Sequence, residues 1–346
     1  MNEEVHVATI ADVAKLAGVA KATASRALSG QGYVAPATRE RVADAAHALG
    51  YIASANASGL ATGRSQSIAV LIPLINRWFL AEVLQGLESA LLAAGYDMTV
   101  YNVSHMSANR SRVFDFFLVR RSFDAVILVG IDASATELET IQRLDKPVAC
   151  VGAPIDGLDS YVLDDYRAAQ LATEHLLGLG HTKIVFVGGP QNHFHDNDPA
   201  SSLVHSDRFR GYSDAMTLAG HAAAITHAPT PLDLESGRQA GRRWLAHPDH
   251  PVTAVLAESD EVAFGVILAA QELGKRVPSD VSIVGIDGHD YAETFGLTTV
   301  QQNPQQLGMS AVSDLLERVT GDDERRHPSP VAPDFVVRHS TTAPPR

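Results

Sequence analysis

Cysteine is almost absent from this 346-residue chain. The one cysteine, Cys150, excludes a disulfide framework and favours a reducing compartment, and we expect it to be a small buried strand residue. The N-terminal residues MNEEVHV lack the basic and apolar regions of a secretory signal, and no apolar run reaches the ~18–20 residues that cross a bilayer. We therefore expect a cytoplasmic protein without a membrane partner.

Motifs for catalysis and cofactor binding are also missing. The chain has no G-x-G-x-x-G after a strand, no P-loop and no G-x-S-x-G. We therefore expect neither an enzyme nor a cofactor. The run HFHDND at 193–198, with His205 nearby, is dense in possible metal ligands. It lacks an evident helical i, i+4 pair and is surrounded by Asn, Pro and Ser, so we expect a solvated loop and no metal site.

Positive charge is scarce, since 27 Lys and Arg face 40 Asp and Glu, for a net charge of −13. Taken alone, this balance argues against a nucleic-acid partner. The charge is unevenly spread, however, because residues 1–64 hold six basic and five acidic side chains. A near-neutral head on an acidic body indicates two modules with different partners.

Three short helices are predicted in the head. Thr9 and Asp12 have the spacing of a capping box, and apolar residues recur at helical spacing from Ile10 until a glycine. A second helix can begin near Ala20, and a third fits residues 37–49. The residues expected to face inward on the third helix are Val42, Ala45, Ala46 and Leu49. A helix, a glycine-containing turn and a second helix are the sequence form of a helix-turn-helix.

The second of these helices has two unlike sides. At about 100° per residue, Lys21, Ala22, Ser25 and Arg26 share one side, and the opposite arc is small and mostly apolar. The apolar arc suits packing on the first helix. The other side suits the DNA major groove, where Lys and Arg bond guanine edges or phosphates and Ala contacts a thymine methyl. A solvated amphipathic helix is the alternative interpretation.

A longer stretch identifies the family that this chain resembles. The run TIADVAKLAGVAKATASRALSGQGYVAPATRERVADAAHALGY resembles the headpiece of the lac repressor/galactose repressor family of bacterial transcription regulators. The resemblance continues through GLATGRSQSIAVLIP, LGHTKIVFVGG, DRFRGY, VPSDVSIVGIDG and LTTVQQN. It implies a helix-turn-helix headpiece at 1–52, a hinge at 53–67 and a core at 68–340. Within the core it implies an N-lobe (about 68–163 and 296–325) and a C-lobe (about 164–293 and 330–340).

By position, the resemblance assigns DNA contacts to the headpiece and the hinge. The residues implied are Thr9, Lys21, Ala22, Thr23, Ser25, Arg26, Tyr33, Thr38, Ser54 and Leu60. The pair Lys21 and Ala22 would read base edges, and Leu60 would wedge between base pairs in the minor groove. Without the resemblance, the Ala-, Ser- and Gly-rich hinge would read equally well as a flexible tether.

The body alternates strand-like runs with amphipathic helices such as residues 79–94. The runs lie at 68–73, 97–103, 124–130, 146–152, 183–189, 253–259 and 280–287. This alternation predicts an α/β fold of parallel sheets flanked by helices, with two lobes and a cleft between them. The resemblance implies a periplasmic-binding-protein-like core with crossovers near 163–165, near 291–295 and after a helix at 305–321. The last strand, DFVVRHS, would return to the second lobe.

The resemblance also implies an effector site in the core. Its residues would be Phe79, Gly152, Arg208, Ser259, Asp287 and Gln302. The alternatives are an interlobe salt bridge for Arg208, a loop cap for Asp287, and a core role for Phe79 and its neighbour Trp78. A guanidinium and a carboxylate can together bind vicinal hydroxyls or a carboxylate of a ligand.

The expected function is therefore a DNA-binding regulator, and more narrowly a repressor. A homodimer would bind a palindromic double-stranded operator, and a sugar or related metabolite between the lobes would control the affinity. Two other classes compete with this interpretation. A solute-binding protein without DNA function is disfavoured by the intact headpiece, and an enzyme on a Rossmann-like body is disfavoured by the missing motifs.

Overall fold

The chain divides into two units in the computed structural model. The first comprises residues 1–66 and 122–124, and the second comprises residues 67–121 and 125–346. The structure describes residues 8–29, 32–51, 64–104, 109–120, 123–189, 203–247, 251–321 and 326–345.

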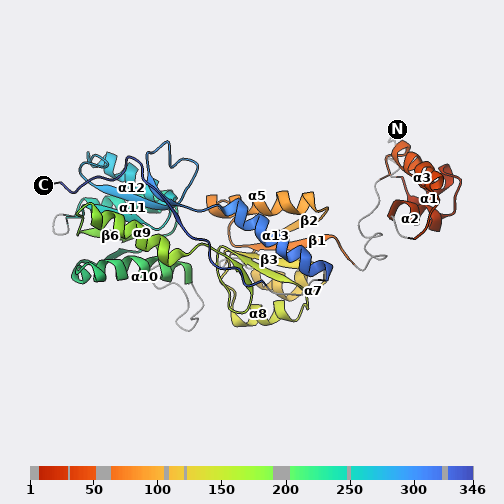
Figure 1. Cartoon of the computed structure of the whole chain (residues 1–346), viewed down its shortest axis with the longest axis horizontal. Coiled ribbons are helices and arrows are strands. Elements are labelled where there is room, and N and C mark those ends of the chain that lie inside the picture. Colours follow the sequence, from red (N-terminus) through yellow and green to blue (C-terminus); the bar gives the residue numbers. More distant parts are fainter. Residues whose placement is uncertain are drawn as a thin grey trace. The chain divides into compact units, whose positions relative to one another are not determined.

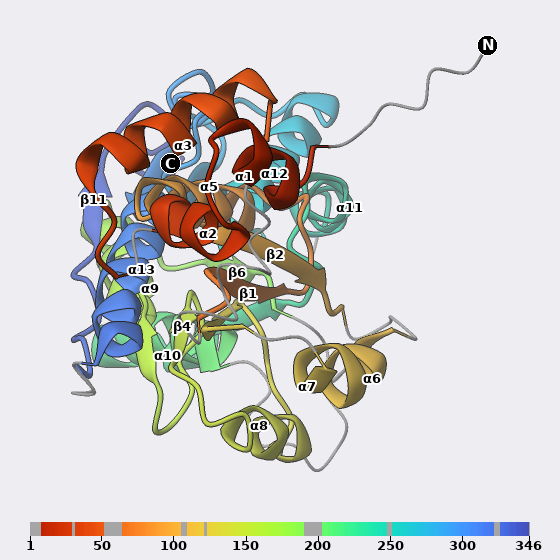
Figure 2. The same ribbon diagram turned by 90° about the vertical axis from the view of Figure 1, so that its right-hand side faces the viewer.

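The first unit contains the three predicted helices, α1 (Ile10–Leu16), α2 (Lys21–Ser29) and α3 (Pro36–Ala48) (Figure 2). The predicted capping box is confirmed, since the side chains of Thr9 and Asp12 each accept a hydrogen bond from the other residue's backbone N–H. The helices enclose a core of small residues, namely Val13, Ala14, Ala17, Ala24, Ala27, Val34, Val42, Ala45 and Ala46. The inward prediction for Leu49 is wrong, because α3 ends at Ala48 and Leu49, its C-cap, is 38% exposed.

The first sheet of the second unit is entirely parallel, in the order β2-β1-β3-β4-β5. Figure 1 labels its strands β1, β2 and β3. Its strands are β1 (Ser67–Ile72), β2 (Asp97–Asn102), β3 (Ala125–Val129), β4 (Val148–Val151) and β5 (Asp159–Tyr161). Helices α5 (Trp78–Ala93) and α13 (Pro304–Thr320) pack together on one face. The other helical segments of this lobe are α6 (Arg110–Arg112), a π-helical turn (Val113–Phe117), α7 (Leu118–Arg120) and α8 (Ala135–Gln142). As predicted, Cys150 is buried, in β4.

The second sheet has the order β11-β10-β9-β8-β6-β7 and is parallel except for β11. Its strands are β6 (Ile184–Val187), β7 (Thr226–Ala228), β8 (Ala254–Ala257), β9 (Ser282–Asp287), β10 (Thr298–Gln301) and β11 (Asp334–Val336). The helices of this lobe are α9 (Asp165–Gly178), α10 (Leu203–Leu218), a 3-10 turn (Ala222–Ala224), α11 (Leu234–Leu245) and α12 (Asp260–Glu272).

Alternate residues of the central strands fill two separate apolar layers. In β6, Ile184 and Phe186 pack with α9 and α10, whereas Val185 and Val187 pack with the layer that includes α12. Successive strand residues point to opposite faces, so a strand covered on both sides is apolar throughout. This two-layer packing explains the uninterrupted apolar runs of the body and confirms the α/β fold with parallel sheets flanked by helices.

Each of the seven predicted strand runs contains a strand, but three short strands were not predicted. They are β5, β7 and β10, and each has polar or small residues at alternate positions. The second crossover also differs from the expectation. The sequence predicts this crossover near 291–295, but β10 pairs with β9 and β11 in the second sheet. Residues 298–301 therefore belong to the second lobe, and the chain leaves that lobe after Gln302. As predicted, β11 returns to the second sheet.

The two outer crossovers run alongside each other. Leu163 and Val331 form a parallel bridge, and the backbone N–H of Asp164 donates to the carbonyl of Val331 at 2.9 Å. Among the described residues, no helix is both long enough and apolar enough to span a membrane.

Candidate functional site

The exposed side of α2 carries the residues that the sequence predicts for the major groove. Lys21, Ala22, Ser25 and Arg26 are exposed, whereas Ala24 is fully buried in the helix-packing core. The Arg26 guanidinium Nε donates to the carbonyl of Ala22 at 3.2 Å, so the side chain lies along its own helix. The two-sided interpretation of α2 is confirmed, and among the described residues of this unit the outer side of the helix is exposed.

The other residues predicted to contact DNA differ in exposure and in the hydrogen bonds that they already make. Thr9 uses its hydroxyl to cap α1, and this hydroxyl also donates to the Asp12 carboxylate at 2.6 Å. Tyr33 is 89% exposed in the connection between α2 and α3, and Thr38 is half-buried in the first turn of α3. Ser54 and Leu60 lie outside the described residues, so their predicted roles stay predictions.

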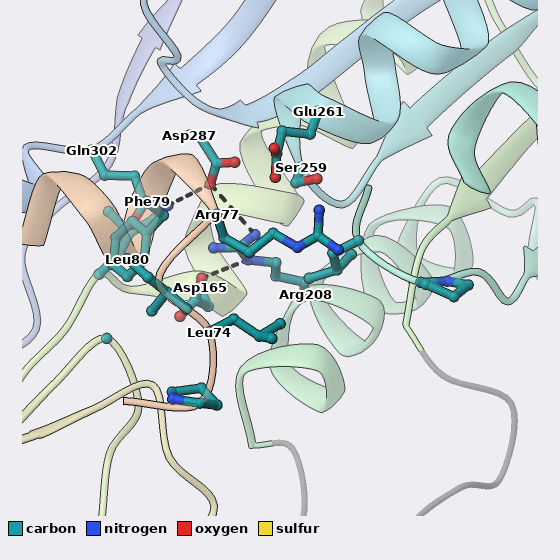
Figure 3. Close-up of a pocket in the computed structure, with 15 residues that line it drawn as sticks. Leu74, Arg77, Phe79, Leu80, Asp165, Arg208, Ser259, Glu261, Asp287 and Gln302 are labelled. Carbon is teal, nitrogen blue, oxygen red and sulfur yellow. Dashed lines mark hydrogen bonds and ion pairs between the residues drawn. The ribbon is translucent and has the colours of Figure 1, made fainter. Parts of the chain in front are cut away.

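The second unit contains a cavity of about 360 Å³. All six residues predicted for the effector site line it, although they are spread from position 79 to position 302 (Figure 3). Phe79 is in the first turn of α5, Gly152 and Ser259 follow β4 and β8, and Asp287 is the last residue of β9. The cavity therefore lies at the carboxyl ends of strands from both sheets, where α/β folds bind ligands.

Arg208 of α10 is the most connected residue of this cavity. Its Nε donates to Asp165 Oδ1 at 2.6 Å and its Nη1 to the carbonyl of Glu258 at 2.5 Å. Nη1 also lies 4.0 Å from Asp287 Oδ1, and the Arg208 side chain is 7% exposed. Because all three partners belong to the second lobe, these contacts of Arg208 lie within that lobe. The alternative of an interlobe salt bridge for Arg208 is therefore wrong.

Asp287 also acts as a cap, which is the alternative role that the sequence suggests for it. Its Oδ1 accepts from Gln302 Nε2 at 2.8 Å, and its Oδ2 accepts from the backbone N–H of Asp260, the first residue of α12, at 3.4 Å. Burial raises the pKa of Asp287 well above its usual range, while Arg208 lowers it. Burial also raises the pKa of Asp260, to about 6, although hydrogen bonds from Thr299 and the His289 backbone lower it. Carboxyl groups whose pKa values are strongly perturbed by burial and nearby charges are found preferentially at functional sites.

The opposite wall of the cavity is apolar, and its contacts depend on a glycine. The apolar lining residues are Pro73, Leu74, Phe79, Leu80, Leu163, Pro231 and Leu232. Gly152 has a φ of 79°, and a Cβ built there would lie 2.7 Å from Phe79 Cε1. Glycine at this position is what allows the Phe79 ring to lie against the backbone.

Replacing Gly152 by alanine is therefore expected to lower the free energy of unfolding by about 1–2 kcal/mol for the left-handed backbone alone, with a steric cost in addition. Denaturant unfolding of Gly152→Ala measures this loss. The matched double variant Gly152→Ala/Phe79→Ala removes the clash, so it should be less destabilised than the sum of the single variants by at least ~0.5 kcal/mol. Strict additivity would contradict the contact.

Three charged lining residues were missed by the sequence prediction, namely Arg77, Asp165 and Glu261. Asp165 could have been predicted as a lining residue, because it lies at the predicted crossover 163–165 and begins α9. Arg77 immediately precedes α5, and Glu261 is the second residue of α12. Many other residues lie at a helix start after a strand, so this placement alone does not identify a lining residue. Pro231 and Leu232 follow β7, a strand that was not predicted.

Trp78 is not a lining residue of the cavity but joins the two lobes beside it. Its indole stacks on His289 with ring centroids 4.9 Å apart, and its Nε1 donates to Asp290 Oδ2 at 3.2 Å. Arg77 makes a second interlobe contact, since its Nη2 lies 3.6 Å from Asp233 Oδ2. The N-terminal end of α5, next to the lining residue Phe79, thus contacts the second lobe through two neighbouring residues.

The histidine-rich run at 193–198 lies outside the described residues. Within the described ranges, no group of three or more His, Cys, Asp or Glu side chains is placed to hold a metal ion.

Comparisons with known proteins agree with this architecture. The family model "Bacterial regulatory proteins, lacI family" matches residues 9–54, and the model "Periplasmic binding protein-like domain" matches residues 173–341. The chain is similar to the transcriptional repressor PurR of Pectobacterium atrosepticum, with 30% identity over 341 residues that cover 96% of this chain and 97% of that protein.

Two solved structures extend the similarity to the fold. A lac repressor dimer bound to operator and the anti-inducer ONPF has a TM-score of 0.84 at 24% identity, covering 97% of this chain and 99% of that chain. A complex of the transcriptional regulator CelR with cellobiose has a TM-score of 0.68 at 26% identity, covering 96% and 99%. These relatives are regulators and not enzymes. The resemblance read from the sequence is therefore confirmed, and this chain belongs to the lacI family of bacterial regulatory proteins.

Proposed function

We propose that this transcriptional regulator is a repressor whose operator affinity is controlled by a small molecule bound in the cavity between its lobes. The observation that carries the proposal is the convergence of six residues from distant parts of the chain on one cavity, in a protein that also has a helix-turn-helix with an exposed polar side. The cavity is not needed for the packing of the helix-turn-helix, and the exposed polar side of α2 is not needed for the packing of the core.

For DNA recognition, the exposed side of α2 enters the major groove. Lys21 and Ala22 contact base edges, while Ser25 and Arg26 contact phosphates or neighbouring bases. A homodimer places two such helices on the half-sites of a palindrome. The remaining proposed contacts, from Thr23, Thr9, Tyr33 and Thr38 in the headpiece and from Ser54 and Leu60 in the hinge, position the protein on the duplex and open the minor groove.

For effector recognition, the polar side of the cavity holds hydroxyl groups. Arg208 offers a guanidinium whose Nε and Nη1 are already fixed by Asp165 and Glu258, and Asp287 is oriented by Gln302. Such pre-oriented groups bind a ligand without first having to be ordered. Because the cavity is lined by both lobes, occupancy changes the relative stability of their arrangements, and this free energy is coupled reciprocally to DNA binding.

The test begins with the DNA. Purified full-length protein should enrich a palindromic duplex from a random DNA library. A panel of sugars, sugar phosphates and nucleosides is then screened by thermal shift, since a ligand that binds only the folded state raises the melting temperature. A Trp244→Phe variant leaves Trp78 as the only tryptophan, beside the cavity, and gives a second binding signal.

The proposal expects at least one stabilising ligand to change operator affinity in fluorescence anisotropy. Failure to enrich any duplex at low salt would contradict the DNA-binding part. Ligands that bind with no effect on operator affinity would contradict the regulatory part.

A further inference from the structure

A single carboxylate binds the segment through which the chain enters its first sheet. Asp124 Oδ1 accepts from the backbone N–H of Ser65 at 2.8 Å and from the Ser65 hydroxyl at 3.0 Å. Asp124 Oδ2 accepts from the backbone N–H of Gln66 at 2.8 Å. Asp124 is only 7% exposed, so water competes little for these hydrogen bonds. One side chain therefore fixes two consecutive residues at the end of the hinge predicted at 53–67.

The backbone of Gln66 has a conformation that needs such fixing. Its φ is 50°, in the left-handed region that residues other than glycine seldom adopt. Gln66 is exposed, so burial of its side chain does not account for this conformation, whereas its N–H bond to Asp124 does. Strained backbone positions persist where the surrounding structure holds them, and they are concentrated at switch regions and ligand-binding segments. The conformation of Gln66 thus indicates a junction whose geometry is fixed.

The strand that follows this junction leads directly to the effector cavity. β1 begins at Ser67 and ends at Ile72, and the next two residues, Pro73 and Leu74, line the cavity. β1 pairs with β2 and β3, and its last five residues are buried. At about 3.3 Å per residue, a six-residue strand spans about 20 Å. A displacement of the cavity wall is therefore transmitted along a well-held strand to the residue that follows Gln66.

Asp124 adds a second connection, through the neighbouring strand. It immediately precedes β3, which pairs with β1 from Ile68 to Leu71. Residues 65 and 66 are thus joined to the sheet by the chain itself, at β1, and by the hydrogen bonds to Asp124, at β3. Two attachments restrict rotation about the backbone bonds between the hinge and β1, which a single covalent link leaves possible.

We propose that Asp124 is a positioning residue for operator binding, whose carboxylate holds the end of the hinge at the start of β1 and β3 so that the core governs the placement of the two headpieces of a dimer. This proposal rests on the proposed function. When one headpiece binds a half-site, a well-held hinge presents the other headpiece at a high effective concentration. Release of the hinge by loss of the carboxylate lowers that concentration, without changing any contact between a headpiece and its half-site.

The test compares two duplexes, the palindrome selected by the wild type and the same duplex with one half-site scrambled. Full-length Asp124→Asn keeps the shape of the side chain but replaces one acceptor oxygen by a donor group. Anisotropy titrations should show that the preference for the palindrome falls at least ~10-fold, which corresponds to about 1.4 kcal/mol. The affinity for the single half-site should stay within about twofold of the wild type, since 1.4 kcal/mol is tenfold. An unchanged preference, or an equal loss on both duplexes, would overturn the proposal.

A second variant leaves the buried carboxylate in place. Ser65→Ala removes the hydroxyl donor and keeps both backbone N–H donors, so the preference for the palindrome should fall by only roughly threefold, as for the loss of one hydrogen bond. If Asp124→Asn does not fold, Ser65→Ala decides, and a preference equal to that of the wild type contradicts the role of Asp124. Where Asp124→Asn folds, amide hydrogen exchange should be faster at Ser65 and Gln66, and equal protection would also contradict that role.

Asp280→Asn is the matched control. Asp280 is in the second lobe, and its Oδ2 likewise accepts from a backbone N–H, that of Arg276 at 2.7 Å. Because Asp280 precedes β9 and not the strands that follow the hinge, its variant should keep the wild-type preference for the palindrome. A fall as large as that in Asp124→Asn would show a general loss of stability and overturn the proposal.

The two proposals fail differently. A wild-type protein that binds no palindrome more tightly than a single half-site would contradict the proposed function, and the role of Asp124 with it. A wild type that prefers the palindrome, with an equal preference in Asp124→Asn, would support the proposed function and overturn the role of Asp124 alone.

Discussion

Replacing Arg208 by methionine is expected to lower the free energy of unfolding of the core by about 3–5 kcal/mol, which is the usual cost of removing one partner of a buried ion pair. Asp165 and Asp287 would remain buried without their countercharge, and the carbonyl of Glu258 would lose its donor. Effector binding should be lost at the same time, because the guanidinium is the group that the carboxylates orient toward the cavity.

The control for this variant is Arg210, two residues after Arg208 on α10. Arg210 has a side chain that is 61% exposed, pairs with Asp207 and lies over the Tyr166 ring. Arg210→Met should change stability by no more than ~1 kcal/mol, as is usual for an exposed pair. Urea unfolding of both variants measures the difference, and wild-type stability of Arg208→Met would contradict the network.

The loss of unfolding free energy in Arg208→Met should also depend on pH, and it should be smaller at lower pH. Burial raises the pKa values of Asp165 and Asp287, and Arg208 lowers both, so its removal raises them further. A carboxyl with a raised pKa in the folded state stabilises the fold at low pH and loses this contribution as the pH rises through that pKa. The stability gap between wild type and variant should therefore narrow as the pH falls from about 7.5 to about 5.5.

Replacing Lys21 by alanine is expected to weaken operator binding by about 1–3 kcal/mol if the ammonium group contacts a base edge, and to relax the base preference at that position. Lys21 is exposed at the first position of α2, on the side that carries Ser25 and Arg26. If Lys21 contacts only phosphate, the loss should be the same for all sequences, and the salt slope should fall by about one.

Lys15 supplies the matched control for this experiment. It is exposed at the end of α1, on a helix that the proposal does not place in the groove, and Lys15→Ala removes the same charge from the headpiece. Anisotropy titrations at several salt concentrations should separate the two variants. Equal affinities of Lys21→Ala and wild type for every duplex would refute both forms of the contact.

Periodic apolar patterns made most of the fold predictable. The arrangement of small residues on α2 fixed which side packs and which side is exposed, and the runs of β1 and β6 are apolar because both faces of each sheet are covered. Short strands with polar positions, such as β10 (TTVQ), escaped prediction because their pairing with β9 and β11 comes from tertiary structure and not from their own pattern.

Six lining residues of the cavity were predictable, but the contacts between them were not. The family resemblance brought Arg208, Asp287 and Gln302 to notice, but nothing in the sequence says that Gln302 donates to Asp287 or that Asp165 pairs with Arg208. Such contacts join residues on separate elements, and only the fold decides their distances.

The most direct test of this account measures the affinity of the full-length Trp244→Phe protein for its selected operator with and without a ligand that fills the cavity, as shown by the fluorescence of Trp78. We predict a change in operator affinity of about 5- to 150-fold, and an equal change in ligand affinity when operator is present. Saturation of the cavity with no change in operator affinity would contradict it.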